Sequence, residues 1–131
     1  MMESTTSAAV TNGVRVEVES TYHPERSTPA RQRWFFSYKI RITNLGDTTI
    51  QLISRHWIIT DGAGHIEEVT GEGVVGQQPV LKPGEAFVYT SFCPLPTPKG
   101  SMRGSYQMAL SSGEQFDVEI APFALVQYTV H

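Results

Sequence analysis

A glycine-rich segment is the first feature of this sequence that could bind a ligand. Gly71, Gly73 and Gly76 have the spacing G-x-G-x-x-G, which lets backbone amides approach a pyrophosphate at the start of a helix. Residues 77–79 (QQP) and a further β-like segment follow, so the helix and the βαβ unit that such a site needs are missing. Glu72 would also repel a phosphate. We expect the glycines to serve a backbone with positive φ and keep a weak anion site as the alternative. The candidate anion-binding residues are Gly71, Gly73, Val74, Val75 and Gly76.

A second group of residues, His56, Asp61, His65, Glu67 and Glu68, contains ligand types that divalent cations take. Because five residues of a strand span about 17 Å, His56 and Asp61 can meet only if the chain folds back at a turn. His65 and Glu67 are two residues apart, which puts them on one face of a strand. We interpret these side chains as solvent-exposed charges, assign no metal site and no cofactor, and leave open weak binding of a divalent cation.

Two residues are candidate nucleophiles, Ser54 and Cys93. Ser54 and His56 share one face of a strand, whereas Arg55 points to the other face. Neither candidate belongs to a nucleophile-elbow motif or precedes a helix that would activate it. We therefore assign no catalytic residue and predict that the protein is not an enzyme.

A basic face with one aromatic residue is the candidate partner surface. It consists of Arg31, Arg33, Phe35, Lys39 and Arg41, most of which alternate with apolar residues along one predicted strand. A single aromatic residue offers little stacking to nucleic-acid bases, and a net charge of −3 gives no bulk attraction to nucleic acid. We predict that this surface contacts an acidic protein partner rather than a specific nucleic acid, and keep a plain solvated face as the alternative.

The elements that must position these residues are β-strands. Val14, Val16 and Val18 alternate with charged residues, and residues 33–42 show the clearest alternation in the chain. The β-rich segment 48–60 changes phase, which predicts a bulge or a fully buried strand, and the turn residues 44–47 predict that it forms a hairpin with the strand before it. About seven strands without helical periodicity predict an all-β fold, a two-sheet antiparallel β-sandwich, with a small barrel as the alternative. Cys93 is the only cysteine, so there is no structural disulfide and the fibronectin type III-like form of the immunoglobulin-like sandwich is favoured.

The length of 131 residues predicts one domain, over residues 14–131. Residues 1–13 are small and polar without periodicity, which predicts a flexible N-terminal tail. The chain contains no run of about 18 apolar residues and no signal-peptide pattern. We therefore predict a cytoplasmic protein that does not contact a membrane.

From residue 14 onward the chain resembles the ApaG family. The resemblance lies in QLISRHWIITD (residues 51–61), GEGVVGQQP (71–79), PGE (83–85) and TPKGSMRGSY (97–106). It implies a fibronectin type III-like sandwich, usually a free-standing bacterial protein. The family also supplies a C-terminal module to some F-box proteins and to a DNA-polymerase-interacting protein, which implies protein partners. Bacterial members are associated with cobalt resistance and magnesium efflux and are often encoded beside a diadenosine tetraphosphatase.

These observations together predict a non-enzymatic binding module that acts through protein–protein contacts with a partner that the sequence does not identify. The alternative is a binder of a polyphosphate nucleotide, or of its divalent-metal complex, at residues 71–76.

Overall fold

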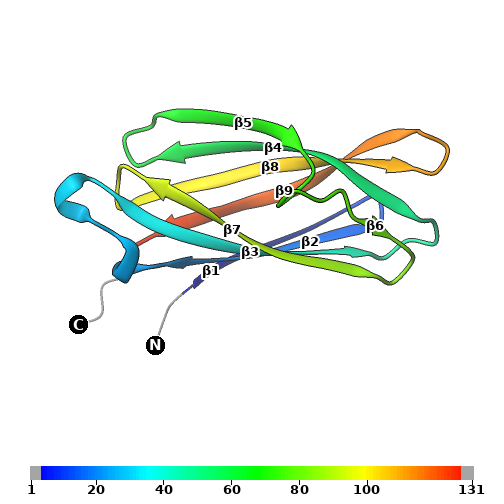
Figure 1. The fold of residues 1–131 in the computed structure, drawn as a ribbon, viewed down its shortest axis with the longest axis horizontal. Coiled ribbons are helices and arrows are strands. Elements are labelled where there is room, and N and C mark those ends of the chain that lie inside the picture. Colours follow the sequence, from blue (N-terminus) through cyan, green and yellow to red (C-terminus); the bar gives the residue numbers. More distant parts are fainter. Residues whose placement is uncertain (1–3, 128–131) are drawn as a thin grey trace.

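The computed structural model describes residues 4–127 and contains, in that range, nine strands and two short 3₁₀ turns (Figure 1). The strands are β1 (Ser4–Thr11), β2 (Val14–Tyr22), β3 (Trp34–Asn44), β4 (Ile50–Asp61), β5 (Ile66–Glu72), β6 (Val80–Leu81), β7 (Ala86–Leu95), β8 (Lys99–Leu110) and β9 (Gln115–Val126), and the turns are η1 (Pro24–Arg26) and η2 (Pro29–Arg31). The first sheet has the order β1-β2-β3-β7 and the second β5-β4-β8-β9, with β6 beside β4. Neighbouring strands are antiparallel, which confirms the predicted two-sheet sandwich of fibronectin type III-like kind.

Alternation along β3 separates the core from the surface as predicted. Phe36, Ile40 and Ile42 are fully buried between the sheets, whereas Lys39 and Arg41 are exposed on the outer face. These residues form a strand because apolar and polar side chains alternate with the period of two that a pleated backbone imposes. The same alternation in β2 buries its three valines.

Of the two explanations for the phase change in residues 48–60, the bulge is confirmed, because the register between β4 and β8 shifts between Leu52 and Ser54. The predicted hairpin between β3 and β4 is wrong. These strands belong to different sheets, and the chain crosses between the sheets at residues 45–49. The buried Asn44 organises this crossing, since its Nδ2 donates to the carbonyl oxygens of Thr48 and Leu81 at 2.8 and 3.0 Å.

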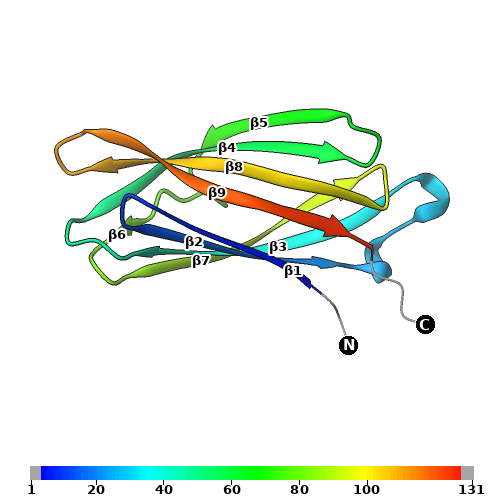
Figure 2. The same ribbon diagram turned by 180° about the vertical axis from the view of Figure 1, so that it is seen from behind.

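The N-terminal segment is a strand rather than the predicted flexible tail. Ser4–Thr11 pairs with β2 along its whole length, and it contacts β9, which lies beside it (Figure 2). Ser7 Oγ donates to the Ala121 carbonyl oxygen at 3.0 Å, and Thr11 Oγ1 accepts the Glu119 amide at 3.1 Å. Small hydroxyl side chains thus close one side of the sandwich. Residues 1–3 of the predicted tail, and 128–131 of the predicted domain, lie outside the described residues.

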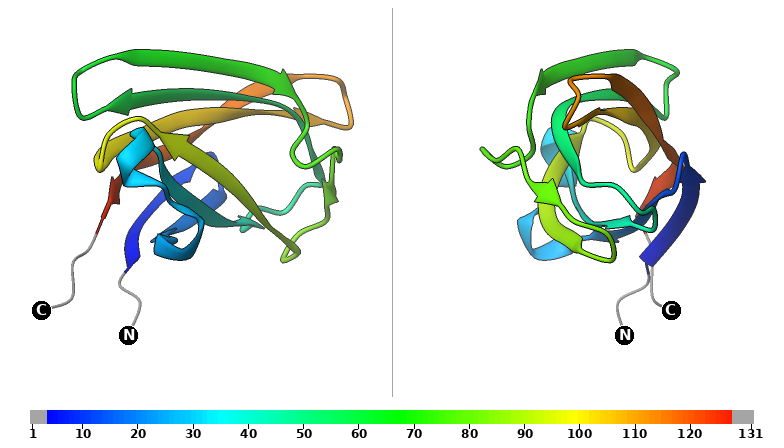
Figure 3. Two further views of the ribbon diagram at one scale, coloured as in Figure 1. Left: turned by 60° about the vertical axis from the view of Figure 1, so that its left-hand side comes forward. Right: turned by 90° about the vertical axis from the view of Figure 1, so that its right-hand side faces the viewer.

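The opposite side of the sandwich is bounded by β5 and β7, the outermost strands of the two sheets (Figures 1 and 3). β7 continues through Pro94 to Leu95, because an edge strand tolerates a residue without an N–H. Of the part of the chain that the structure describes, no helix is long and apolar enough to span a bilayer.

Candidate functional site

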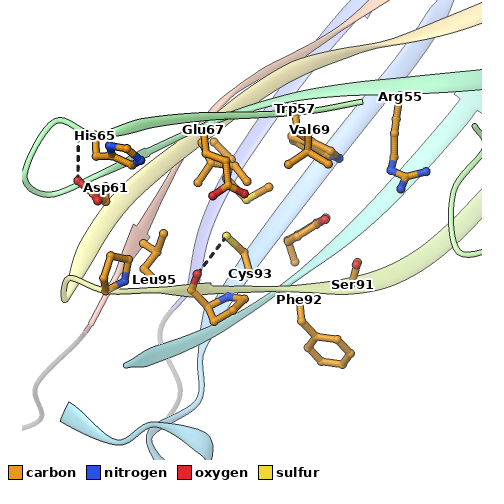
Figure 4. A pocket seen from close by; sticks show the side chains of 15 residues that line it. Arg55, Trp57, Asp61, His65, Glu67, Val69, Ser91, Phe92, Cys93 and Leu95 are labelled. Carbon is orange, nitrogen blue, oxygen red and sulfur yellow. Dashed lines mark hydrogen bonds between the residues drawn. The ribbon is translucent and has the colours of Figure 1, made fainter. Parts of the chain in front are cut away.

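A groove lies on the open side of the sandwich, between β4 and β5 of the second sheet and β7 of the first (Figure 4). Its main part has a volume of about 630 Å³, which is within the usual range for ligand sites. A smaller hollow of about 310 Å³ continues it beneath residues 71–76. The two parts share Tyr38, Arg55, Trp57 and Ser91.

Polar and apolar side chains are ordered along this groove. Figure 4 shows Arg55 at one end near Ser91, and Asp61 with His65 at the other. The buried Trp57 and Cys93 lie between these ends, where Glu67 points into the groove. The groove therefore has a cation at one end, an apolar floor, and carboxylates towards the other end.

Arg55 is the half-buried cation of the groove. Its Nη1 donates to the carbonyl oxygens of Glu72 and Gly73 at 2.9 and 2.8 Å. No carboxylate forms an ion pair with it among residues 4–127. Gly71 lies against the guanidinium so closely that a Cβ there would be 2.8 Å from Nη2. The first glycine of the motif thus makes room for Arg55.

The remaining glycines of the loop shape a tight turn. Gly73 and Gly76 have φ values of 62° and 77°, which confirms that the loop requires positive φ. Val75 also has positive φ, so Val75 and Gly76 form a two-residue turn of type I′. Val74 and Gln77 close this turn with two backbone hydrogen bonds of 2.8 and 2.9 Å.

Hydrogen bonds within the fold use part of the donors of the candidate anion-binding loop. The amide of Gly73 donates to the Ile53 carbonyl oxygen at 2.8 Å, and that of Val74 is used within the turn. The carbonyl oxygens of Glu72 and Gly73 face Arg55. Two of the loop amides are therefore committed to the fold, and no helix follows the loop to add a dipole.

The five candidate metal ligands do not form one cluster. His56 Nε2 contacts Glu68 Oε1 at 3.1 Å on the outer face of the second sheet, whereas Asp61, His65 and Glu67 line the groove. Asp61 Oδ1 accepts the amides of Ala63 and His65, so this carboxylate stabilises the turn. Within residues 4–127, no group of three or more His, Cys, Asp or Glu side chains is placed to hold a metal ion.

The two candidate nucleophiles lack an activating partner in the described part of the chain. Ser54 Oγ donates to Gln107 Oε1 at 2.8 Å, while the ring of His56 is bonded to Glu68 instead. Burial raises the pKa of the Cys93 thiol to about 12, with a smaller contribution from the Glu67 carboxylate. Cys93 is therefore protonated at neutral pH and is a poor nucleophile.

Three tyrosine hydroxyl groups lie under the groove. Tyr89 and Tyr106 hydrogen-bond to each other through their hydroxyls, and Tyr38 lies in the neighbouring strand β3. Burial raises the pKa of all three, and the positive charge of Arg55 opposes this only in part. These hydroxyls stay protonated at neutral pH and act as hydrogen-bonding groups.

The candidate partner surface divides into two parts. Lys39 and Arg41 lie directly opposite Glu19 and Glu17 on β2, so their charges are balanced on the same face. Arg31 and Arg33 instead line a shallow hollow of about 450 Å³ together with Pro94, which pairs with Phe35. The predicted basic face is therefore cationic mainly at this end.

An aromatic pair that sequence reasoning missed extends this cationic end. The rings of Phe35 and Phe92 lie with centroids 5.3 Å apart, and the Arg26 guanidinium lies over both, at 4.1 and 5.1 Å. Figure 4 shows the Phe92 ring turned away from the groove. We call Arg26, Arg31, Arg33, Phe35 and Phe92 the arginine–phenylalanine patch.

The groove was also missed, although one signal in the sequence pointed to it. Arg55 has the same parity in β4 as the core residue Trp57, so a tryptophan that faces the core predicts an inward arginine. The position of Phe92 had no comparable signal, since its neighbour Phe35 is distant in the sequence.

Comparisons with known proteins give one consistent result. A family model described as "ApaG domain" matches residues 24–110. The chain is 59% identical to "Protein ApaG" of Anaeromyxobacter dehalogenans over 120 residues, which are 92% of this chain and 94% of that protein. It is also 59% identical to "Protein ApaG" of a Bradyrhizobium species over 89% of this chain and 90% of the relative. The crystal structure of an ApaA protein from Bordetella pertussis has a TM-score of 0.84 and 55% identity, covering 86% of this chain and 92% of that one.

Proposed function

This chain belongs to the ApaG family, and from that premise we propose that it is a non-enzymatic binding module that acts through contacts with partner proteins. The observation that carries this proposal is the arginine–phenylalanine patch. Phe92 is 50% exposed, yet its ring packs against Phe35 at an angle of 36° and lies 5.1 Å below the Arg26 guanidinium. Exposed aromatic and arginine side chains that are already held in place are typical of the residues that dominate protein–protein binding energy.

The charge of the patch indicates the kind of partner. Arg26, Arg31 and Arg33 contribute three positive charges, and the nearby Glu25 is bonded to His23. An acidic partner surface with an apolar residue to cover Phe92 would complement it. We place this interaction in the cytoplasm, as the sequence predicted.

The association of the family with cobalt resistance and magnesium efflux fits an indirect role. We propose that this chain affects either metal through its protein partner. The division of the candidate ligands between two faces of the second sheet supports this view. Isothermal titration with Co²⁺ and Mg²⁺ tests it, and we expect no tight binding of either ion.

The alternative function, binding of a polyphosphate nucleotide at residues 71–76, has weaker support. Arg55 supplies a cation beneath the loop, but two loop amides are committed and Glu72 lies beside the turn. We expect titration with ATP or diadenosine tetraphosphate to show no micromolar binding. Micromolar affinity would favour the alternative.

A comparative capture experiment tests the proposed function. The wild-type protein, Phe92→Ser and Val80→Ser are each immobilised and exposed to bacterial lysate, and bound proteins are quantified by mass spectrometry. Val80 is the matched control because it is 54% exposed and lies on β6, outside the patch. We expect at least one protein that is retained by the wild type and Val80→Ser and lost with Phe92→Ser. An identical set of proteins for all three would contradict the proposal.

A further inference from the structure

Two opposite charges, those of Arg55 and Glu67, face the groove without an ion-pair partner among residues 4–127. Arg55 uses only Nη1 in hydrogen bonds within residues 4–127, which leaves the N–H groups of Nε and Nη2 for a ligand. The Glu67 carboxylate makes no side-chain hydrogen bond or ion pair with any described residue, and it points towards Cys93 (Figure 4). A ligand that fills the groove can therefore satisfy a cation and an anion at once.

The spacing of the two charges matches an extended peptide. Arg55 pairs with Gly71, and Glu67 pairs with Ile59, so the charges are four positions apart along β4. At about 3.3 Å per residue this is about 13 Å. An extended chain that lies in the groove along the direction of β4 has the same rise, and its side chains i and i+4 share one face. An acidic and a basic residue four positions apart would then meet Arg55 and Glu67.

The middle of the groove accepts an apolar residue. Trp57, Val69 and Cys93 lie between the two charges, and all three present apolar or weakly polar atoms. Residue i+2 of an extended peptide points to the same face as i and i+4 and would lie over this floor. A polar residue there would lose hydration without gaining a partner.

The strands that border the groove favour a peptide backbone as well. The first sheet ends at β7, so the inner face of β5 is not covered by a further strand. Both β5 and β7 are edge strands and keep one side free of strand pairing. Edge strands supply backbone donors and acceptors to an added extended segment.

We propose that the groove between β5 and β7 binds an extended segment of a partner protein that carries an acidic residue, an apolar residue and a basic residue at positions i, i+2 and i+4. This inference rests on the proposed function, because the occupant belongs to a protein. The groove meets the arginine–phenylalanine patch at Phe92, but the Phe92 ring is turned away from the groove (Figure 4), so the two can fail separately.

Fluorescence anisotropy with labelled peptides tests the inference. The probe is an octapeptide with glutamate, leucine and lysine at i, i+2 and i+4, separated by threonines. The control peptide has the same composition with the lysine moved to i+3, which turns it to the opposite face. We expect saturable binding of the probe below about 1 mM and at least about tenfold weaker binding of the control.

Two protein variants show whether Glu67 is the partner of the lysine. Glu67→Lys reverses the charge in the groove, and Glu68→Lys makes the same change on the neighbouring residue, which faces away from the groove towards His56. We expect Glu67→Lys to weaken the probe about tenfold and to favour a peptide with glutamate at both ends. Glu68→Lys should change the affinity less than about twofold, as a screened surface charge does. Circular dichroism of both variants serves as the control for folding.

Several outcomes would overturn the inference. Absence of saturable probe binding, equal affinity for the control peptide, or equal weakening by the two lysine variants would each do so. Displacement of the probe by ATP would assign the groove to a nucleotide instead. Phe92→Ser should leave probe binding unchanged. A negative capture experiment with that variant therefore does not test peptide binding in the groove.

Discussion

Replacing Gly73 by alanine tests the interpretation that the glycine motif serves the backbone rather than a nucleotide. A Cβ at Gly73 would lie 2.3 Å from the carbonyl oxygen of Gln77, at a backbone φ of 62°. Gly76 has a similar φ of 77°, but a Cβ there would meet no atom within 4 Å. Gly76→Ala is therefore a matched control that carries the backbone strain without the collision.

The two substitutions differ in expected magnitude. Alanine at positive φ costs about 1 kcal/mol, which is the whole effect expected for Gly76→Ala. In Gly73→Ala the turn must also open, and it then loses the two backbone hydrogen bonds between Val74 and Gln77, at about 1 kcal/mol each. We expect a total of about 3 kcal/mol. For a domain of this size 1 kcal/mol corresponds to about 4 °C, so the melting temperature falls by about 4 °C for Gly76→Ala and about 12 °C for Gly73→Ala.

Thermal unfolding followed by circular dichroism measures both values, with and without ATP. Equal losses for the two alanine variants would refute the steric part of the reasoning, and an unchanged melting temperature for Gly73→Ala would refute all of it. Glu72→Gln removes a charge beside the loop and leaves the backbone alone, so its melting temperature should barely move. If ATP raised the melting temperature of Glu72→Gln, the loop would be an anion site that Glu72 holds in check.

Three further predictions follow from the same structure. Phe36→Ala removes a fully buried ring and should lower the free energy of unfolding by about 3 to 5 kcal/mol, whereas Phe35→Ala should lower it far less. Urea titration measures both losses, and equal losses would show that the faces of β3 are misassigned. Val75→Asn should raise the free energy of unfolding by about 1 kcal/mol in the same urea titration, because asparagine tolerates the positive φ that strains a β-branched residue. A lower stability would contradict the type I′ turn. Burial raises the pKa of Cys93 to about 12, so its alkylation by iodoacetamide should be slow at pH 7 and accelerate about tenfold per pH unit up to pH 9.5. A plateau of the alkylation rate near pH 9 would indicate an ordinary thiol.

The N-terminal strand shows where sequence patterns stop being informative. Ser4–Thr11 alternates between half-buried and exposed positions, but serine, threonine and alanine differ little in hydropathy, so no period of two is visible in the sequence. The strand is held by pairing with β2 and by hydroxyl groups bonded to β9, more than 100 residues away. Such contacts exist only after the sheets have assembled.

The charge of the candidate partner surface is a second property that local sequence patterns do not predict. Its residues on β3 were correctly placed on one outward face, because alternation is a local property. The register with β2 then set Glu17 and Glu19 beside Arg41 and Lys39, which no local pattern reveals. The positive charges that are not balanced in this way therefore lie at the end of the sheet, where Phe92 of β7 packs against Phe35.

Sequence patterns alone indicate the all-β class, the inward and outward faces of β3, the phase change in β4 and the need for positive φ at one or more glycines of residues 71–76. Each of these depends on backbone geometry over a few residues. Assembly of the two sheets sets three further features: β3 and β4 belong to different sheets, Gly71 makes room for Arg55, and a groove lies between the edges at β5 and β7. The physical reason is that strand order and register come from pairing between distant segments, whereas the alternation of side chains is the same for every partner that a strand could choose.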